Sequence, residues 1–190
     1  MVVAGLIRPD MKIEIEVTGL SRRFGPEDKL LVPWRGQPLV RHAAEALRSA
    51  GCAELIAVVS QPQVAAQLPG FTLLWVAPGL PMSQSFSAAL SHAQRRGAGG
   101  LLLTLGDMPQ VDGALLRRLL ALPGSAACIA DGRRMPPAHL VAADFADALA
   151  LPPGDHGARV VIAAIPPERL VAIDRAAARD IDLPGDLPGP

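Results

Sequence analysis

The chain has 190 residues, enough for one domain over residues 1–190 with a substantial buried core. Half of the residues are hydrophobic and 19% are charged, which excludes a disordered tail and a fibrous protein. Eighteen basic residues balance eighteen acidic ones, so no net charge attracts a nucleic acid or an anionic membrane. Any anion must therefore bind at a local site.

The apolar runs of the sequence are short. Residues 101–105, among the cleanest of them, fall far below the ~18 to 20 residues that a membrane span requires. Residues 2–7 are apolar, but no basic leader precedes them and no long apolar region follows. We therefore expect a cytoplasmic protein without a membrane span.

Two segments are candidates for the first strand. Residues 2–7 are continuously apolar, which favours a buried central strand and would make residues 8–18 an inserted or altered connection. Residues 13–17 alternate strictly, which is typical of a half-exposed strand, and burying Glu14 and Glu16 unpaired would be costly. The alternative places residues 13–17 in the sheet and treats the first ten residues as an extension.

Farther along, apolar runs alternate with amphipathic helices. The runs have the character of strands covered on both faces, and they lie at residues 55–60, 71–76, 101–105 and 126–130. The helical stripes are Leu39, Val40, Ala43, Ala44 and Leu47, then Phe86, Ala89, Leu90 and Ala93, then Leu115, Leu116, Leu119 and Leu120.

The ends of these helices also carry signals. A serine cluster should cap the second helix, Gly97 should end it, and Asp112 should cap the third. The alternation of strands and helices predicts an α/β fold with a mostly parallel sheet and helices on both faces. In such sheets the ligand binds beyond the carboxyl ends of the strands.

A glycine-bounded loop runs from Gly19 to Gly25 and is followed by Lys29. Such a loop brings backbone N–H groups close to a phosphate chain, and Arg23 and Lys29 would add the charge that phosphates need. The loop lacks the closing Gly-Lys-Ser/Thr of a Walker A motif and the spacing of a dinucleotide site. On its own it is equally consistent with a polar surface loop.

Acidic residues follow at two places. Asp107 comes directly after the run 101–105, where an exposed carboxylate contributes little to stability but is well placed to hold a divalent cation. Asp180 and Asp182 alternate shortly before Pro184, so both should point to one side and one of them could be a second metal ligand. The alternatives are a turn-forming Gly-Asp pair and a solvated acidic turn.

A series of motifs then follows in a fixed order. They are Ser21-x-Arg23-Phe24-Gly25, Lys29-Leu30-Leu31, Gly36-Gln37-Pro38-Leu39, Met82-Ser83-x-Ser85, Gly106-Asp107-Met108-Pro109, Gly154-Asp155-x-Gly157-Ala158-Arg159 and Asp180-Ile181-Asp182-x-Pro184 with Asp186-Leu187. This series resembles the molybdenum cofactor nucleotidyltransferases, and most closely the cytidylyltransferase branch. The resemblance extends from about Gly19 to Leu187, and the ordered combination is far more specific than any single motif.

The resemblance implies a Rossmann-like nucleotidyltransferase that moves CMP from CTP to the phosphate of molybdopterin, with Mg²⁺ as cofactor and pyrophosphate as product. It implies that Asp107 and Asp182 bind Mg²⁺ and that Lys29, Asp107 and Arg23 are catalytic. The nucleotide-binding residues would be Gly19, Ser21, Arg23, Gly25, Lys29, Ser83 and Ser85. Arg134 and Arg159 could face the acceptor, although Arg134 could equally be a solvated loop charge and Asp155 could cap the helix that follows it. A receiving molybdoenzyme or its chaperone is a further expected partner.

The sequence also departs from the family pattern. Val17 and Thr18 stand before Gly19 where small residues are expected, so they could crowd the base or the ribose. One alternative is therefore a related transferase that uses GTP, another nucleotide or another phosphorylated acceptor. A second is a catalytically silent nucleotide- or cofactor-binding protein. Residues 183–190 are rich in proline and glycine, and we expect a frayed tail.

Overall fold

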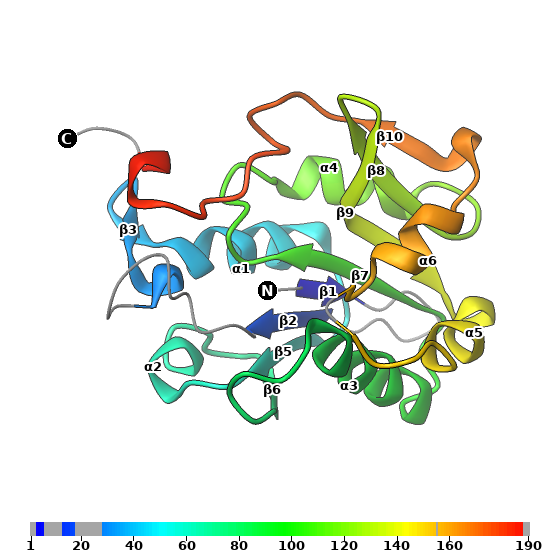
Figure 1. Cartoon of the computed structure of the whole chain (residues 1–190), viewed down its shortest axis with the longest axis horizontal. Coiled ribbons are helices and arrows are strands. Elements are labelled where there is room, and N and C mark those ends of the chain that lie inside the picture. Colours follow the sequence, from blue (N-terminus) through cyan, green and yellow to red (C-terminus); the bar gives the residue numbers. More distant parts are fainter. Residues whose placement is uncertain (1–2, 6–12, 18–27, 155, 188–190) are drawn as a thin grey trace.

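A central sheet organises the chain. The computed structural model describes residues 3–5, 13–17, 28–154 and 156–187. Within them, eight strands form a sheet in the order β10-β8-β9-β7-β1-β2-β5-β6 (Figure 1). The strands are β1 (Val3–Gly5), β2 (Ile13–Val17), β5 (Leu55–Val59), β6 (Thr72–Trp75), β7 (Gly100–Leu105), β8 (Ala126–Ala130), β9 (Arg133–Val141) and β10 (Leu170–Ala172). A separate pair joins β3 (Pro33–Trp34) to β4 (Gln37–Pro38).

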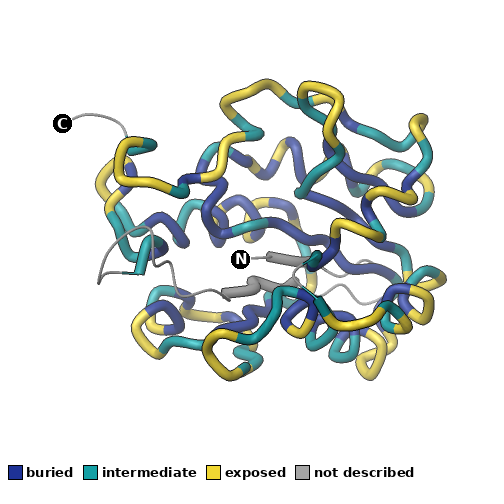
Figure 2. The backbone as a smooth tube through the Cα atoms, in the orientation of Figure 1, coloured by how far each residue is buried: buried dark blue, intermediate teal, exposed yellow. Residues whose placement is uncertain are grey.

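Helices cover both faces of the sheet, as the alternating pattern predicts. They are α1 (Leu39–Ala50), α2 (Pro62–Ala65), α3 (Met82–Arg95), α4 (Gly113–Leu120), α5 (Phe145–Leu149) and α6 (Arg159–Ala164). One apolar cluster joins α1, α2 and α4 to the sheet, and a second joins α3, α5 and α6 to the opposite face. Along β5, Ala57 faces the first cluster while Ile56 and Val58 face the second. Figure 2 shows buried residues gathered in the interior of the described part of the molecule and exposed residues on its outer loops.

The four later strands and the three helices predicted from residue spacing are confirmed, with one change at a helix terminus. The strands predicted at 55–60, 71–76, 101–105 and 126–130 are β5, β6, β7 and β8, shifted by at most one residue at either end. Asp112 caps α4 as predicted, since its carboxylate accepts a bond from the Leu115 amide at 2.8 Å. The serine cluster does not cap α3, which begins at Met82 after Pro81, with the serines already inside the helix. None of the described helices is both long and apolar enough to span a membrane.

Of the two candidates for the first parallel strand, residues 13–17 take this position and residues 2–7 do not. β2 pairs in parallel with β5 and with β7, so residues 13–17 hold the central parallel position. β1 is also a strand, but it runs antiparallel to β2, β5 and β7. The preference for residues 2–7 as the central parallel strand was therefore wrong. It rested on local hydrophobicity, whereas the position of β2 is set by its pairing with strands far along the chain.

Two further segments differ from the sequence predictions. Residues 133–141, in which Arg134 was considered a loop residue, form the long strand β9, antiparallel to both β7 and β8. Residues 184–186 form a 3₁₀ turn, and Leu187 packs against a small cluster of Trp34, Leu39 and Ile181. The frayed tail predicted from Leu183 onward is thus folded as far as Leu187, because apolar contacts and the Asp186 carboxylate hold it.

Candidate functional site

Three charged side chains from distant parts of the chain meet at one point. Lys29 lies in a short 3₁₀ turn (Lys29–Leu31), and its Nζ donates to Asp107 Oδ2 at 2.7 Å and to Asp182 Oδ1 at 2.6 Å. Asp107 follows β7, so the cluster lies at the carboxyl end of a central parallel strand, where ligands of such sheets bind. The two carboxylates share one ammonium and are therefore within reach of one cation.

Backbone contacts explain how each partner is placed. Asp28 caps the turn that carries Lys29, because its carboxylate accepts from the Leu30 amide at 3.0 Å. The Ile181 amide donates to the Asp107 carbonyl at 2.9 Å, and the Ile181 side chain is fully buried. Asp186 accepts from the amides of Asp182 and Leu183 at 3.1 and 2.8 Å. The segment carrying Asp182 is thereby fixed beside the tip of β7.

Burial makes this cluster electrostatically strong. Asp107 is only 6% exposed, so it is not the exposed carboxylate that the sequence predicts, whereas the Asp182 side chain is 47% exposed. Burial alone would lower the pKa of Lys29, but Asp107 and Asp182 outweigh it and raise that pKa above its ordinary value. Lys29 is therefore a cation under physiological conditions.

The same carboxylates suit a hard divalent cation. Asp107 Oδ1 is buried and has no hydrogen-bond partner among the described residues, which leaves an oxygen free to act as a ligand. Asp180 lies nearby, and its pKa is raised by burial and by the charges of Asp107 and Asp182. No group of three or more metal-binding side chains occurs in the described ranges. Mg²⁺ is commonly bound by two carboxylates, with water and phosphate oxygens as its other ligands.

A cavity of about 620 Å³ opens beside this cluster. Both arginines predicted to face an acceptor, Arg134 and Arg159, line it together with Asp180 and with Leu105 at the end of β7. Its other lining residues are Met82, Gly132, Arg133, Met135, Pro136, His156, Ala158 and Ala163. Arg134 donates to the Ala163 carbonyl, so β9 and the carboxyl end of α6 are joined across the cavity wall.

The two serines predicted to bind nucleotide are buried in α3. Ser83 Oγ accepts from the Gly154 amide at 2.8 Å, and Ser83 N donates to the Gly154 carbonyl at 3.1 Å. Ser85 is fully buried, and its Oγ has no partner among the described residues. The remaining predicted nucleotide-binding residues, Gly19, Ser21, Arg23 and Gly25, and the suggested cap Asp155 lie outside the described residues.

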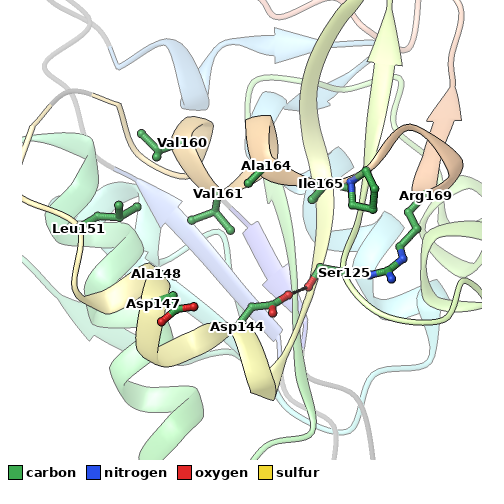
Figure 3. A pocket seen from close by; sticks show the side chains of 11 residues that line it. Ser125, Asp144, Asp147, Ala148, Leu151, Val160, Val161, Ala164, Ile165 and Arg169 are labelled. Atoms are coloured by element: carbon green, nitrogen blue, oxygen red, sulfur yellow. Dashed lines mark hydrogen bonds between the residues drawn. The ribbon is translucent and has the colours of Figure 1, made fainter.

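A second hollow, of about 320 Å³, lies between α5 and α6 (Figure 3). Ser125 and Asp144 are hydrogen-bonded on its wall, and Ser125 Oγ also accepts from the Val141 amide at 2.9 Å. Ser125 precedes β8, which runs in the same direction as β7. This hollow therefore lies at the amino ends of these strands, whereas Asp107 lies at the carboxyl end of β7. It does not contain the cluster of Lys29, Asp107 and Asp182 described above.

Sequence reasoning missed the residues that hold the site in place. Ile181 and Asp186 fix Asp182, and Asp28 fixes Lys29, although none of the three was singled out as a positioning residue. The signals were present in part, since Asp before a short turn and Asp after Leu-Pro-Gly are typical capping residues. Ile181 gave no such signal, because its burial depends on contacts with Trp34 and Leu39.

Comparison with the sequences of characterised proteins identifies relatives that are similar to part of this chain. Over 119 residues the chain is 32% identical to the molybdenum cofactor guanylyltransferase of Xanthomonas euvesicatoria pv. vesicatoria, covering 63% of this chain and 58% of that protein. Over 103 residues it is 33% identical to the bifunctional enzyme IspD/IspF of Novosphingobium aromaticivorans, covering 52% of this chain and 27% of that enzyme. The chain thus spans well under two thirds of the length of either curated relative.

Solved structures extend the similarity over most of the chain. The crystal structure of Rv0371c from Mycobacterium tuberculosis H37Rv aligns with a TM-score of 0.75 and 27% identity, covering 91% of this chain and 92% of that one. A manganese complex of the same protein aligns with a TM-score of 0.68 over 85% of this chain and 86% of that one. The predicted α/β nucleotidyltransferase fold is thereby confirmed. Residues 17–170 match the MobA-like NTP transferase domain, and the chain belongs to that family.

Proposed function

We propose that this protein transfers CMP from CTP to the terminal phosphate of molybdopterin and releases pyrophosphate, in the cytoplasm and with Mg²⁺ as its metal. The observation that carries this proposal is the Lys29 ammonium held between Asp107 and Asp182 at the carboxyl edge of the sheet. A polyphosphate substrate requires a basic side chain that can donate to its oxygens, together with carboxylates that can hold a divalent cation. A molybdoenzyme or its chaperone would receive the product.

The reaction joins two anions, so its chemistry is chiefly positioning and charge neutralisation. An oxygen of the acceptor phosphate forms a bond to the α-phosphorus of the nucleotide, while the bond from that phosphorus to the β-phosphate breaks and pyrophosphate leaves. Lys29 would donate to the phosphate oxygens, and Arg134 and Arg159 would hold the acceptor phosphate in the cavity that they line. Asp107 and Asp182 would hold Mg²⁺, which offsets the negative charge of the triphosphate when bound.

A second candidate uses GTP in place of CTP. It is favoured by the identity to a molybdenum cofactor guanylyltransferase. The resemblance implies that Ser83 and Ser85 bind the nucleotide, but both side chains are buried. Neither hydroxyl therefore distinguishes the two bases, and an assay with each nucleotide decides between the two candidates.

The test is a pyrophosphate-release assay with each NTP, Mg²⁺ and molybdopterin. Release with CTP alone supports the proposal, and release with GTP supports the second candidate. Nucleotide binding without release under every condition would mean a silent binding protein instead.

A pair of matched variants tests the site itself. Asp107→Asn retains the shape of the side chain but removes its charge, and we expect turnover to fall at least about a hundredfold with unchanged circular dichroism. Asp112→Asn makes the same chemical change at a helix cap outside the site and should keep full activity, because asparagine caps helices as well as aspartate does. Equal activity of the two variants would refute the role given to Asp107.

A further inference from the structure

Ser83 joins two parts of the chain that lie 71 residues apart. It sits in the first turn of α3, whose amides have no partners within the helix, and Pro81 offers no side-chain cap. The Gly154 carbonyl takes the place of a cap by accepting from Ser83 N at 3.1 Å, and the Gly154 amide donates to Ser83 Oγ at 2.8 Å. The backbone N–H and the carbonyl of Gly154 are thus both hydrogen-bonded to Ser83.

This double contact is partly shielded from water. Ser83 is only 5% exposed and Gly154 is half-buried, so breaking the bond would leave a partly buried amide without its protein partner. Beside it, Met82 packs closely on Gly157, where an added side chain would come within 3.3 Å of the Met82 methyl carbon. Gly157 has a positive φ of 50°, so the chain turns sharply at this contact.

Described residues after position 155 line the 620 Å³ cavity, which would hold the acceptor under the proposed function. The His156 ring is hydrogen-bonded to the Pro152 carbonyl at 2.8 Å, and the Arg159 amide donates to the His156 carbonyl at 2.9 Å. His156 and Arg159 both line the 620 Å³ cavity, as does Met82 from the first turn of α3. Gly154 is thus fastened to α3 five residues before Arg159, at the start of α6, which Ala158 and Ile162 pack onto the sheet.

We propose that Ser83 is a positioning residue for the acceptor: by fastening Gly154 to α3 it sets where Arg159 meets the acceptor phosphate. This role differs from a direct contact with the nucleotide base, which a buried hydroxyl already bonded to Gly154 is poorly placed to make. The inference rests on the proposed function for the identity of the acceptor.

The kinetic test compares Ser83→Ala with Ser83→Thr, which keeps the hydroxyl. Ser83→Ala should raise the KM for molybdopterin about tenfold and leave the KM for the NTP unchanged, because a positioning hydrogen bond is lost. Ser83→Thr should restore the wild-type value. Ser87→Ala, one turn farther along α3, is the matched control and should behave as wild type. A rise in the KM for the NTP instead would overturn the proposal in favour of base contact.

A double-mutant cycle tests whether Ser83 acts through Arg159. In an Arg159→Ala background, Ser83→Ala should no longer change the KM for molybdopterin, whereas additive effects would overturn the proposed route.

Amide hydrogen exchange gives a readout that does not depend on activity. The Gly154 amide should exchange at least about tenfold faster in Ser83→Ala than in wild type or Ser83→Thr. If the wild-type protein transfers no nucleotide, the proposed function fails, while unchanged exchange at Gly154 overturns the fastening role whatever the activity.

Discussion

Lys29 and a divalent cation would compete for the same two carboxylates. The ammonium bonds Asp107 Oδ2 and Asp182 Oδ1, so a metal ion can use these two oxygens only if Lys29 gives them up, and its positive charge repels a cation bound at the unpaired Asp107 Oδ1. The phosphates of a nucleotide offer the ammonium an alternative partner. At the residue scale this competition would couple metal binding to nucleotide binding, and Lys29 would hold the carboxylates together when neither ligand is bound.

This competition predicts a gain of metal affinity on losing the lysine. Lys29→Met should bind Mn²⁺ at least about tenfold more tightly than wild type in the absence of nucleotide, because a positive charge beside both carboxylates is removed. Titration with Mn²⁺ followed by electron paramagnetic resonance measures this directly. The control is the double variant with Asp107→Asn, which should lose the gain. Equal affinities of Lys29→Met and wild type would show that Lys29 does not occupy the metal's place.

At the scale of elements, the local residue pattern correctly predicted those strands, helices and caps that depend mainly on neighbouring residues. The four apolar strands β5 to β8 and the helices α1, α3 and α4 follow from residue spacing, and the cap at Asp112 follows from its type and position. The order of β1 and β2 could not be predicted in this way, because it depends on pairing with β5 and β7. β9 was missed because its charged and proline-rich start resembles a loop, although it pairs with β7 and β8.

The cap of α4 gives a prediction at this scale. Asp112→Ala should lower the free energy of unfolding by about 1 kcal/mol, because the Leu115 amide loses its partner at the helix terminus. Asp112→Asn should be close to wild type. Urea unfolding of both variants measures the difference, and an unchanged midpoint for Asp112→Ala would show that the cap does not contribute to stability.

At the scale of the whole molecule, the candidate site is assembled from segments that the sequence keeps far apart. Lys29 is separated by 78 residues from Asp107 and by 153 from Asp182, and the cavity beside them draws residues from α3, β9 and α6. The chemical types of the three charged residues could be predicted from motifs. Their contact through one ammonium, the burial of Asp107 and the enclosure of Ser83 could not, because each depends on how the sheet brings these segments together.

Global stability should also respond to a buried histidine that takes no part in the site. His139 in β9 is only 4% exposed, and neither ring nitrogen has a hydrogen-bond partner among the described residues. Burial lowers its pKa from the ordinary 6.5 to about 4, although the nearby Asp144 charge acts in the opposite direction. Between these two values the unfolded chain takes up a proton that the folded protein does not, so stability falls as the pH falls through this window.

We therefore predict that the free energy of unfolding drops by about 2 kcal/mol between pH 7 and pH 5 through His139. Urea unfolding at a series of pH values would show this loss in wild type and in a His42→Gln control, which retains His139. His139→Leu should lack this part of the pH dependence, because the group that takes up the proton on unfolding is gone. An identical pH profile for His139→Leu and wild type would mean that other groups cause the acid sensitivity. A smaller loss in the wild type would mean that His139 is protonated in the folded sheet, which requires water or Asp144 to reach its ring.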